Sequence, residues 1–259
     1  MPDAPDLPDF SIDLSGQVAF VTGTTSGLGR RFAEVLAAAG AAVACTGRRV
    51  ERLDELADVI RSRGGTCLPI PLDVTDADAC MAAVGRAEDE LGPVSILVNN
   101  AGIPDAQYAT KMPIELIDQV LDTNLRGPFV LSCEVARRLI ARKVPGRIVN
   151  IASTGAFSYG GNGAALYSIT KAGIVRMTET LAVEWSRFGI NVNAIAPGAF
   201  RSEMMDGMLD RMGDITKAFP RGRLGEPHQL DSTLLYLVAP SSEAVTGTVV
   251  IVDDGQGPR

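Results

Sequence analysis

Short apolar runs alternate along the chain with longer segments that have the composition of helices. The apolar runs are rich in Val, Ile and Ala and predict buried strands. The expected strands are residues 18–21, 42–46, 67–72, 96–98, 147–151, 191–195 and 249–252. The expected helices are residues 30–39, 50–63, 77–91, 114–142, 164–187 and 229–238. Such alternation is typical of α/β proteins, in which helices cover both faces of a parallel sheet.

Two segments fall outside this alternation. Residues 1–14 are acidic and rich in proline, and we expect them to form a flexible N-terminal arm. Residues 199–223 are rich in Met and Arg with scattered glycines, and we expect a mobile lid over a substrate site. No repeat or linker interrupts the remaining series, so a single domain is expected over residues 15–259.

The composition of the 259 residues, 46% hydrophobic and 21% charged, is that of a soluble globular protein. The net charge of −7 and the lack of a basic run disfavour nucleic acid as a partner. The sequence shows neither a signal peptide nor an apolar stretch of transmembrane length, so we expect a cytoplasmic protein without membrane contact. With four scattered cysteines and one histidine, no metal site is expected.

A glycine-rich turn joins the first expected strand to the helix after it. The segment from Thr22 to Gly29 reads TGTTSGLG. Glycines permit a tight turn and a close approach of the backbone to a pyrophosphate, and the helix start adds free N–H groups. Because a strand precedes this turn and a helix follows it, we expect a dinucleotide site in a Rossmann-type doubly wound parallel sheet of about seven strands.

The second expected strand ends in Thr46-Gly-Arg-Arg49. In dinucleotide folds this end faces the adenosine ribose, where an acidic residue binds the 2′-hydroxyl and arginine accommodates a 2′-phosphate. Arg48 and Arg49 stand here without an acidic neighbour, and guanidinium groups bind phosphate bidentately. The sequence therefore favours NADP(H), while NAD(H) remains the alternative if both arginines are surface charges.

Tyr167 and Lys171 lie four residues apart in an expected helix, which places a phenol and an ammonium on one face. A free tyrosine titrates near pH ~10, and a nearby positive charge favours the phenolate and lowers its pKa. The pair therefore indicates a general acid and base.

Together these motifs resemble the short-chain dehydrogenase/reductase family, in its short single-domain, 3-oxoacyl reductase-like branch. The resemblance covers about residues 12 to 255. The residues that carry it, in the expected order, are Thr22–Gly29, Leu72–Val74, Asn99–Gly102, Asn124, Ser153, Tyr167 with Lys171, and Pro197-Gly198.

The resemblance implies a catalytic tetrad of Asn124, Ser153, Tyr167 and Lys171. Tyr167 would give its proton to a carbonyl oxygen that Ser153 polarises. Lys171 would hold the nicotinamide ribose and lower the pKa of Tyr167, and Asn124 would position a water beside Lys171. The expected cofactor contacts are Gly23, Thr25, Ser26, Gly27, Leu28, Gly29, Arg48, Arg49, Asp73, Val74, Asn100, Ala101, Gly102, Tyr167, Lys171, Pro197, Gly198, Phe200 and Ser202.

The loop between Ser153 and Tyr167 is expected to line the substrate site. It is glycine-rich and carries Phe157 and Tyr159, so the expected substrate contacts are Ser153, Phe157, Tyr159 and Tyr167. Phe200 and the lid methionines would add apolar surface, or the methionines merely pack the lid. Asp105 is not expected to contact substrate. The C-terminal sequence VDDGQG departs from the family's commoner Asp-Gly-Gly, and we attach no function to that change.

We therefore expect an NADP-dependent oxidoreductase that reversibly reduces a ketone to a secondary alcohol. The substrate stays open among a 3-oxoacyl thioester, small or bulky ketones, and a sugar or polyol. One alternative is an NAD-linked alcohol or sugar dehydrogenase that works in the oxidative direction. Another is a non-catalytic NADP-binding regulatory protein. Because relatives in this family are commonly tetramers, a homotetramer is expected.

Overall fold

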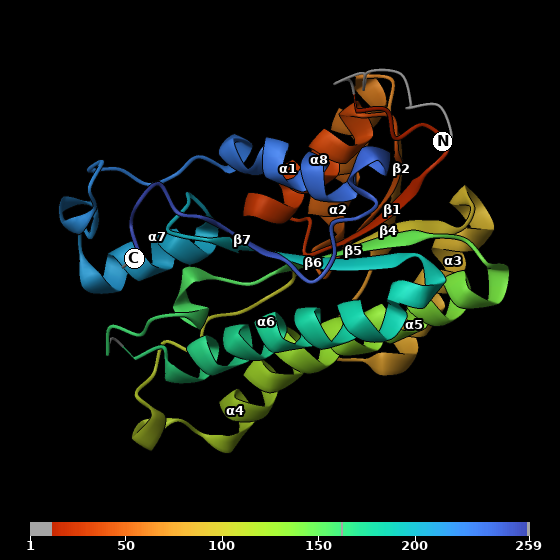
Figure 1. Cartoon of the computed structure of the whole chain (residues 1–259). Coiled ribbons are helices and arrows are strands. Elements are labelled where there is room, and N and C mark those ends of the chain that lie inside the picture. The colour runs from red at the N-terminus through yellow and green to blue at the C-terminus, as the bar shows by residue number, and fades with distance from the viewer. Residues whose placement is uncertain (1–11, 162, 258–259) are drawn as a thin grey trace, which may run out of the picture.

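The computed structural model describes residues 12–161 and 163–257 and shows a seven-stranded parallel sheet between two layers of helices (Figure 1). The order of strands across the sheet is β3-β2-β1-β4-β5-β6-β7. The strands are β1 (Val18–Thr22), β2 (Ala42–Gly47), β3 (Thr66–Pro71), β4 (Val94–Asn99), β5 (Gly146–Ile151), β6 (Ile190–Pro197) and β7 (Val249–Val252). The predicted doubly wound sheet is confirmed. The order reverses between β1 and β4, which is where such folds place a ligand crevice.

Helices cover both faces of the sheet, as Figure 1 shows. One layer contains α1 (Gly27–Ala38), α2 (Val50–Ser62) and α8 (Asp231–Val238). The other contains α3 (Ala77–Leu91), α4 (Ile114–Leu121), α5 (Gly127–Arg142) and α6 (Ala165–Trp185). An additional helix, α7 (Glu203–Met212), lies beyond the carboxyl end of β6. No helix in residues 12–161 and 163–257 is long and apolar enough to cross a bilayer.

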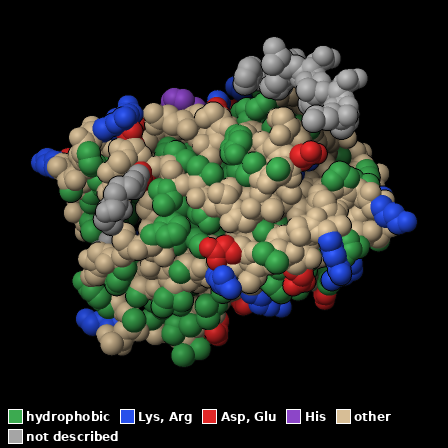
Figure 2. Space-filling view, viewed as in Figure 1, with side chains coloured by type: hydrophobic (Ala, Val, Ile, Leu, Met, Phe, Trp, Pro, Cys, Tyr) green, Lys and Arg blue, Asp and Glu red, His purple; other side chains and the backbone are tan. Residues whose placement is uncertain are grey.

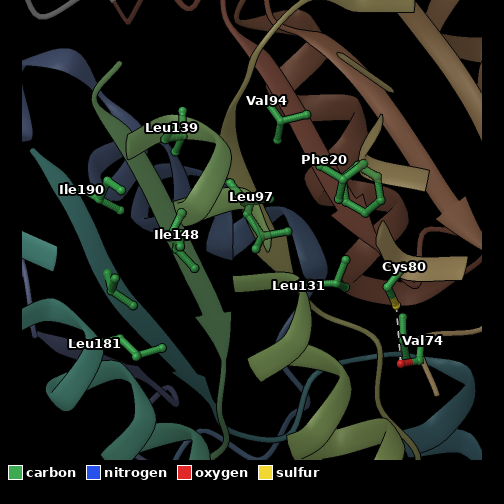
Figure 3. Packing of buried hydrophobic residues seen from close by; sticks show 14 of the residues in the cluster. Phe20, Val74, Cys80, Val94, Leu97, Leu131, Leu139, Ile148, Leu181 and Ile190 are labelled. Carbon is green, nitrogen blue, oxygen red and sulfur yellow. Dashed lines mark hydrogen bonds between the residues drawn. The ribbon is translucent and has the colours of Figure 1, made fainter. Parts of the chain in front are cut away.

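The two layers have separate apolar cores because successive side chains of a strand point to opposite faces. Phe20 belongs to the core under α3, α5 and α6, whereas its neighbour Val21 belongs to the core under α1, α2 and α8. Figure 3 shows Phe20 with Leu97 and Ile148 of neighbouring strands and Leu131 of α5. All four are almost fully buried, so the sheet is fixed from both sides and its carboxyl edge is a rigid base for a site.

The helix predicted over residues 114–142 is interrupted by a π-helical turn, Asp122–Arg126. Here the N–H of Gly127 donates to the carbonyl of Asp122, five residues earlier. Pro128 follows and has no N–H, so it cannot make the ordinary bond to the carbonyl four residues before it. A Cβ on Gly127 would lie 2.7 Å from the carbonyl of Val74, so the chain also passes very close to the loop after β3. The prediction of one regular helix is therefore wrong at this turn.

Two other boundaries differ from the predictions. Helix α1 begins at Gly27, three residues before the predicted start, so the end of the glycine-rich turn is already helical. Leu14 was assigned to the flexible arm, but it is fully buried and its N–H donates to the carbonyl of Ala39 at 2.8 Å. The packed domain therefore includes Leu14; residues 1–11 of the predicted arm lie outside the described residues.

Candidate active site

A cavity of about 940 Å³ opens at the carboxyl edge of the sheet. Its wall combines the turns after β1, β2, β3, β4 and β5 with α6, α7 and the chain that follows β7. The expected cofactor contacts on this wall are Gly23, Thr25, Ser26, Gly27, Leu28, Arg48, Arg49, Asp73, Val74, Asn100, Ala101, Gly102, Tyr167, Lys171, Pro197, Gly198, Phe200 and Ser202. Segments far apart in the sequence thus meet at one cavity, and only Gly29 of that set lies off its wall.

The glycine turn packs so tightly against the end of β4 that side chains are excluded from it. A Cβ on Gly23 would lie 2.9 Å from Cα of Ala101. A Cβ on Gly29 would lie 2.3 Å from both the carbonyl oxygen of Gly23 and Nδ2 of Asn100. Asn100 fixes the turn by donating from Nδ2 to the carbonyl of Thr22 at 2.9 Å. Gly29 therefore serves packing, while the rest of the turn offers bare backbone to the cavity, which fits the pyrophosphate of a dinucleotide.

The two arginines expected at a 2′-phosphate have different partners. Arg49 donates from Nη2 to the hydroxyl of Thr25 at 2.8 Å and from Nη1 to Glu203 of α7 at 2.9 Å. Arg48 lies 3.9 Å from Asp73, and its side chain is 62% exposed. Arg49 thus links the glycine turn to α7, and Arg48 is the less engaged cation.

Three of the predicted catalytic groups converge at the carboxyl end of β5. Nζ of Lys171 lies 5.5 Å from the centre of the Tyr167 ring, on the same side of α6. Lys171 is buried, and Nζ donates to the carbonyl of Ile151 at 2.7 Å. The Ser153 hydroxyl lies close enough to the Tyr167 phenol to lower the pKa of that phenol. Oγ of Ser153 also accepts the N–H of Gly155 at 3.1 Å, which fixes the position of this oxygen.

Burial raises the pKa of the Tyr167 hydroxyl, the hydrogen bond with Ser153 lowers it, and the charge of Asp105 raises it, with an upward net direction. Burial also lowers the pKa of Lys171 to about 8. Lys171 is not among the groups that shift the pKa of Tyr167 here, so the lowering expected from Lys171 together with the nicotinamide charge stays a prediction. Desolvation opposes the charged form of both groups.

Asn124, the fourth expected catalytic residue, stands in the π turn and faces the loop after β4 rather than the cavity. Its Oδ1 accepts the N–H of Ile103 at 2.8 Å, and its Nδ2 donates to the carbonyl of Ile103 at 2.9 Å. Nδ2 also donates to the hydroxyl of Thr170 on α6 at 3.3 Å. A Cβ on Gly102 would lie 3.4 Å from Oδ1 of Asn124 and 3.7 Å from Nζ of Lys171. Asn124 thus links the loop after β4 to α6, close to Lys171.

Asp105 is a site residue that sequence reasoning missed. It is buried, and its Oδ2 accepts the backbone N–H of Tyr167 at 3.0 Å. Its Oδ1 accepts the N–H of Ala106 at 2.7 Å. Ala164, at the N-cap position of α6, has no side-chain acceptor. Asp105 therefore caps α6 from a distant loop, as a carboxylate at a helix N-terminus does. The only signal in the sequence was its place shortly after Asn99–Gly102.

The aromatic residues expected at the substrate lie elsewhere. Phe157 is 52% exposed and Tyr159 is 48% exposed, and neither lines the cavity. The loop instead presents Ser158 to it, so the structure does not bring the two aromatic side chains to the cavity. Phe200 reaches the wall, but its ring is buried in the core, and a Cβ on Gly225 would lie 2.6 Å from that ring. The apolar surface at this end comes from α7 instead.

The C-terminal segment after β7 also belongs to the site. Oε1 of Gln256 accepts the N–H of Ala199 at 2.6 Å, where the predicted lid begins. Asp254 forms ion pairs with Arg221 at 2.7 Å and Arg223 at 2.9 Å, where the lid ends. The segment therefore holds both ends of the lid. The VDDGQG departure was the signal in the sequence, but its meaning depends on these long-range contacts.

Comparisons with known proteins agree with the geometry. A model of the short chain dehydrogenase family matches residues 17–212. Gluconate 5-dehydrogenase of Gluconobacter oxydans is 35% identical over 254 residues, which is 97% of each chain. The 3-oxoacyl-[acyl-carrier-protein] reductase FabG of Rickettsia bellii is 35% identical over 245 residues, 94% of this chain and 98% of its own.

Solved structures are similar over almost the whole chain. A short-chain type dehydrogenase/reductase from Mycobacterium marinum has a TM-score of 0.91 and 34% identity over 94% of this chain and 96% of its own. A variant of the actinorhodin polyketide ketoreductase, solved with NADPH, has a TM-score of 0.89 and 34% identity over 94% of this chain and 98% of its own. With the family model matched over most of its length, this chain belongs to the short-chain dehydrogenase/reductase family and is an oxidoreductase.

Proposed function

We propose that the chain reversibly reduces a ketone to a secondary alcohol with NADP(H), and that Tyr167 acts as general acid and base. The convergence of Tyr167, Ser153 and Lys171 at one end of a cavity whose floor is the glycine turn carries this proposal. When bound along that floor, the nicotinamide supplies the hydride for reduction and accepts it in oxidation.

Tyr167 and Ser153 both act on the carbonyl oxygen of the substrate. The Tyr167 hydroxyl donates its proton to the oxygen as negative charge builds there, and the Ser153 hydroxyl donates a hydrogen bond to the same atom. Because Oγ of Ser153 is fixed by the N–H of Gly155, this donor is preorganised. Lys171 uses one of its three N–H donors on Ile151, which leaves two for the hydroxyls of a ribose.

The preference for NADP(H) rests on Arg48 and Arg49 at the end of β2. Both arginines line the cavity, and the Arg48 side chain is largely exposed to solvent. The second candidate is an NAD-linked dehydrogenase that works in the oxidative direction. Its support is that each arginine already faces a carboxylate, Asp73 or Glu203, so neither is free of an acidic neighbour.

Two of the relatives leave the substrate class open, because one is named for gluconate and the other for a 3-oxoacyl thioester. We propose that this chain takes a substrate with an apolar body. The cavity wall beyond the tetrad is formed by methionines of α7 together with Ile215 and Phe219. Such a wall favours apolar parts of a ligand, while Ser153 and Tyr167 orient its polar reacting group.

We also propose a homotetramer in which α4, α5 and α6 form contacts between subunits. Large apolar side chains of these helices are exposed: Ile114, Phe129, Ile169 and Val183 are each 48–79% accessible. Figure 2 shows hydrophobic side chains gathered over the end of the molecule that carries α4. Light scattering coupled to size exclusion tests the proposal, because a monomeric mass at micromolar concentration contradicts it.

Oxidation of NADPH and NADH, followed at 340 nm with a panel of ketones, tests the activity. We expect turnover with NADPH and a secondary alcohol as product.

In Arg48→Ala we expect kcat/KM for NADPH to fall about tenfold while that for NADH changes little, since a charged contact to the 2′-phosphate is lost. Arg86→Ala, at an exposed pair on α3, is the matched control. Equal losses with both cofactors would contradict NADP preference, and cofactor binding without turnover of any ketone would contradict the activity.

A further inference from the structure

Beyond Glu203, its first residue, which lines the cavity and pairs with Arg49, α7 presents methionines and one arginine to the cavity and no acidic side chain. Met204, Met205, Met208 and Met212 line it, and Arg211 lines it with them. Asp206 and Asp210, the acidic residues in the middle of the helix, are not on the wall. Met204, Met208 and Arg211 follow the spacing of one helix face. This face is therefore apolar with a single cation at its carboxyl end.

Arg211 has no ion-pair partner within residues 12–161 and 163–257, whereas the other arginines near the cavity are paired. Arg48 faces Asp73, and Arg49 faces Glu203. Arg221 and Arg223 both bind Asp254 at the far end of the lid. Lys171, the other cation on the wall, donates to a carbonyl and belongs to the catalytic group. Arg211 is thus the cation on this wall that is left for a ligand.

We infer that the substrate is an organic anion, whose apolar middle lies against the methionines of α7 and whose carboxylate or phosphate binds Arg211. A guanidinium offers planar, paired donors that match the oxygens of either anion. In a chain of net charge −7, an arginine among methionines on the cavity wall, with its neighbours Asp206 and Asp210 off that wall, is suited to select such a ligand. The inference rests on the proposed function, because it describes the substrate of the same site.

A purely structural role for Arg211 gives a different expectation. A cation in the last turn of a helix interacts favourably with the carbonyl end of that helix. In that case substitution would destabilise α7 and affect all substrates alike. Anion binding by Arg211 predicts that its substitution affects only charged substrates, whereas a structural role predicts the same effect on charged and neutral substrates.

Matched substrates that differ only in the anionic group provide the test. Levulinate and longer keto acids are compared with their methyl esters, and dihydroxyacetone phosphate is compared with dihydroxyacetone. The variants are Arg211→Gln and Arg211→Lys, with Lys217→Gln as the control, because Lys217 carries the same charge in the neighbouring turn but does not line the cavity. The carboxylate and phosphate pairs show which anion the site takes.

We expect KM for the preferred anion to rise about tenfold in Arg211→Gln with little change in kcat, since the lost contact is distant from the reacting carbonyl. KM for the neutral partner should stay within about twofold, and Arg211→Lys should restore part of the loss. Equal changes for charged and neutral substrates, or no preference for either anion in the wild type, would overturn the inference. Wild-type turnover of the neutral ketones alone would leave the proposed function standing while this inference fails.

A binding measurement adds a readout that does not depend on turnover. Decanoate, which has no ketone, should raise the melting temperature of the wild type more than decanol does. That difference should disappear in Arg211→Gln and persist in Lys217→Gln. If decanoate still raises the melting temperature of Arg211→Gln more than decanol does, the assignment of the anion site to this arginine is contradicted.

Discussion

Helices α6 and α7 face each other across the same cavity and are held in opposite ways. In α6, which carries Tyr167 and Lys171, eight of 21 residues are buried, and its start is capped by Asp105. In α7, no residue of ten is buried. Its segment is held at the edges by Glu203, Gln256 and Asp254. The proposed catalytic residues are thus attached to the core, whereas the proposed substrate wall is held by a few polar contacts, which favours local opening.

The largest effect on kcat is expected from removal of the Tyr167 hydroxyl oxygen, on the helix α6 that is attached to the core. Tyr167→Phe should lower kcat by about 10²–10⁴-fold, because the proton donor is lost while packing is nearly unchanged. Fluorescence titration should show the affinity for NADPH within a few-fold of the wild type. A variant with normal kcat would show that another group transfers the proton.

The cap of α6 should affect both stability and pH dependence. Asp105→Ala should lower the free energy of unfolding by about 1 kcal/mol through loss of the cap, measured by urea denaturation. Asp105→Asn keeps an acceptor oxygen but removes the charge that raises the pKa of Tyr167. The pKa of the phenol should therefore fall in Asp105→Asn, and the decline of ketone reduction at high pH should begin at lower pH. The side chains beside the phenol, Ser153 and Lys171, are unchanged in both variants. If the pH dependence of ketone reduction is the same in Asp105→Asn as in the wild type, Asp105 caps α6 but does not affect the pKa of Tyr167 during the reaction.

On the α7 side, substitutions should act on KM rather than on kcat. Gln256→Ala removes two bonds to Ala199, one accepted by Oε1 and one donated by Nε2, and should raise KM for the ketone several-fold, since each bond contributes about 1 kcal/mol to holding this end of the lid. Steady-state kinetics with Gln256→Glu, which keeps the acceptor oxygen, provide the comparison. A fall in kcat with KM unchanged would mean that the lid shapes the reacting geometry.

The smallest effect is expected where α7 meets the glycine turn. Glu203→Gln weakens an exposed pair with Arg49, and such pairs contribute about 0.2–1 kcal/mol. If Glu203 competes with a 2′-phosphate for Arg49, the variant should bind NADPH up to a few-fold more tightly and NADH with unchanged affinity. Titration of both cofactors checks this, and equal tightening would attribute the effect to lid opening instead.

The sequence predicted the sheet and the convergence of its loops because both depend on local patterns. Buried runs indicate strands, and parallel strands carry their following loops to one edge. Asp105 and Gln256 escaped prediction because they act on backbone groups 62 and 57 positions away. Phe157 and Tyr159 lie off the cavity wall, and composition does not tell which way a loop side chain points. The upward direction of the Tyr167 pKa depends on burial, which spacing alone does not give.

The π turn makes the length of the chain at this point critical. A π turn holds one more residue than an α-helical turn would, so deletion of one residue within Asp122–Arg126 would let α4 and α5 join in regular register. Because the wider turn absorbs the extra residue, such a deletion would leave α4 and α5 close to their present orientations and would displace the residues of the turn itself. Asn124 would swing away from Ile103, and the support behind Lys171 would be lost without any substitution in the cavity itself.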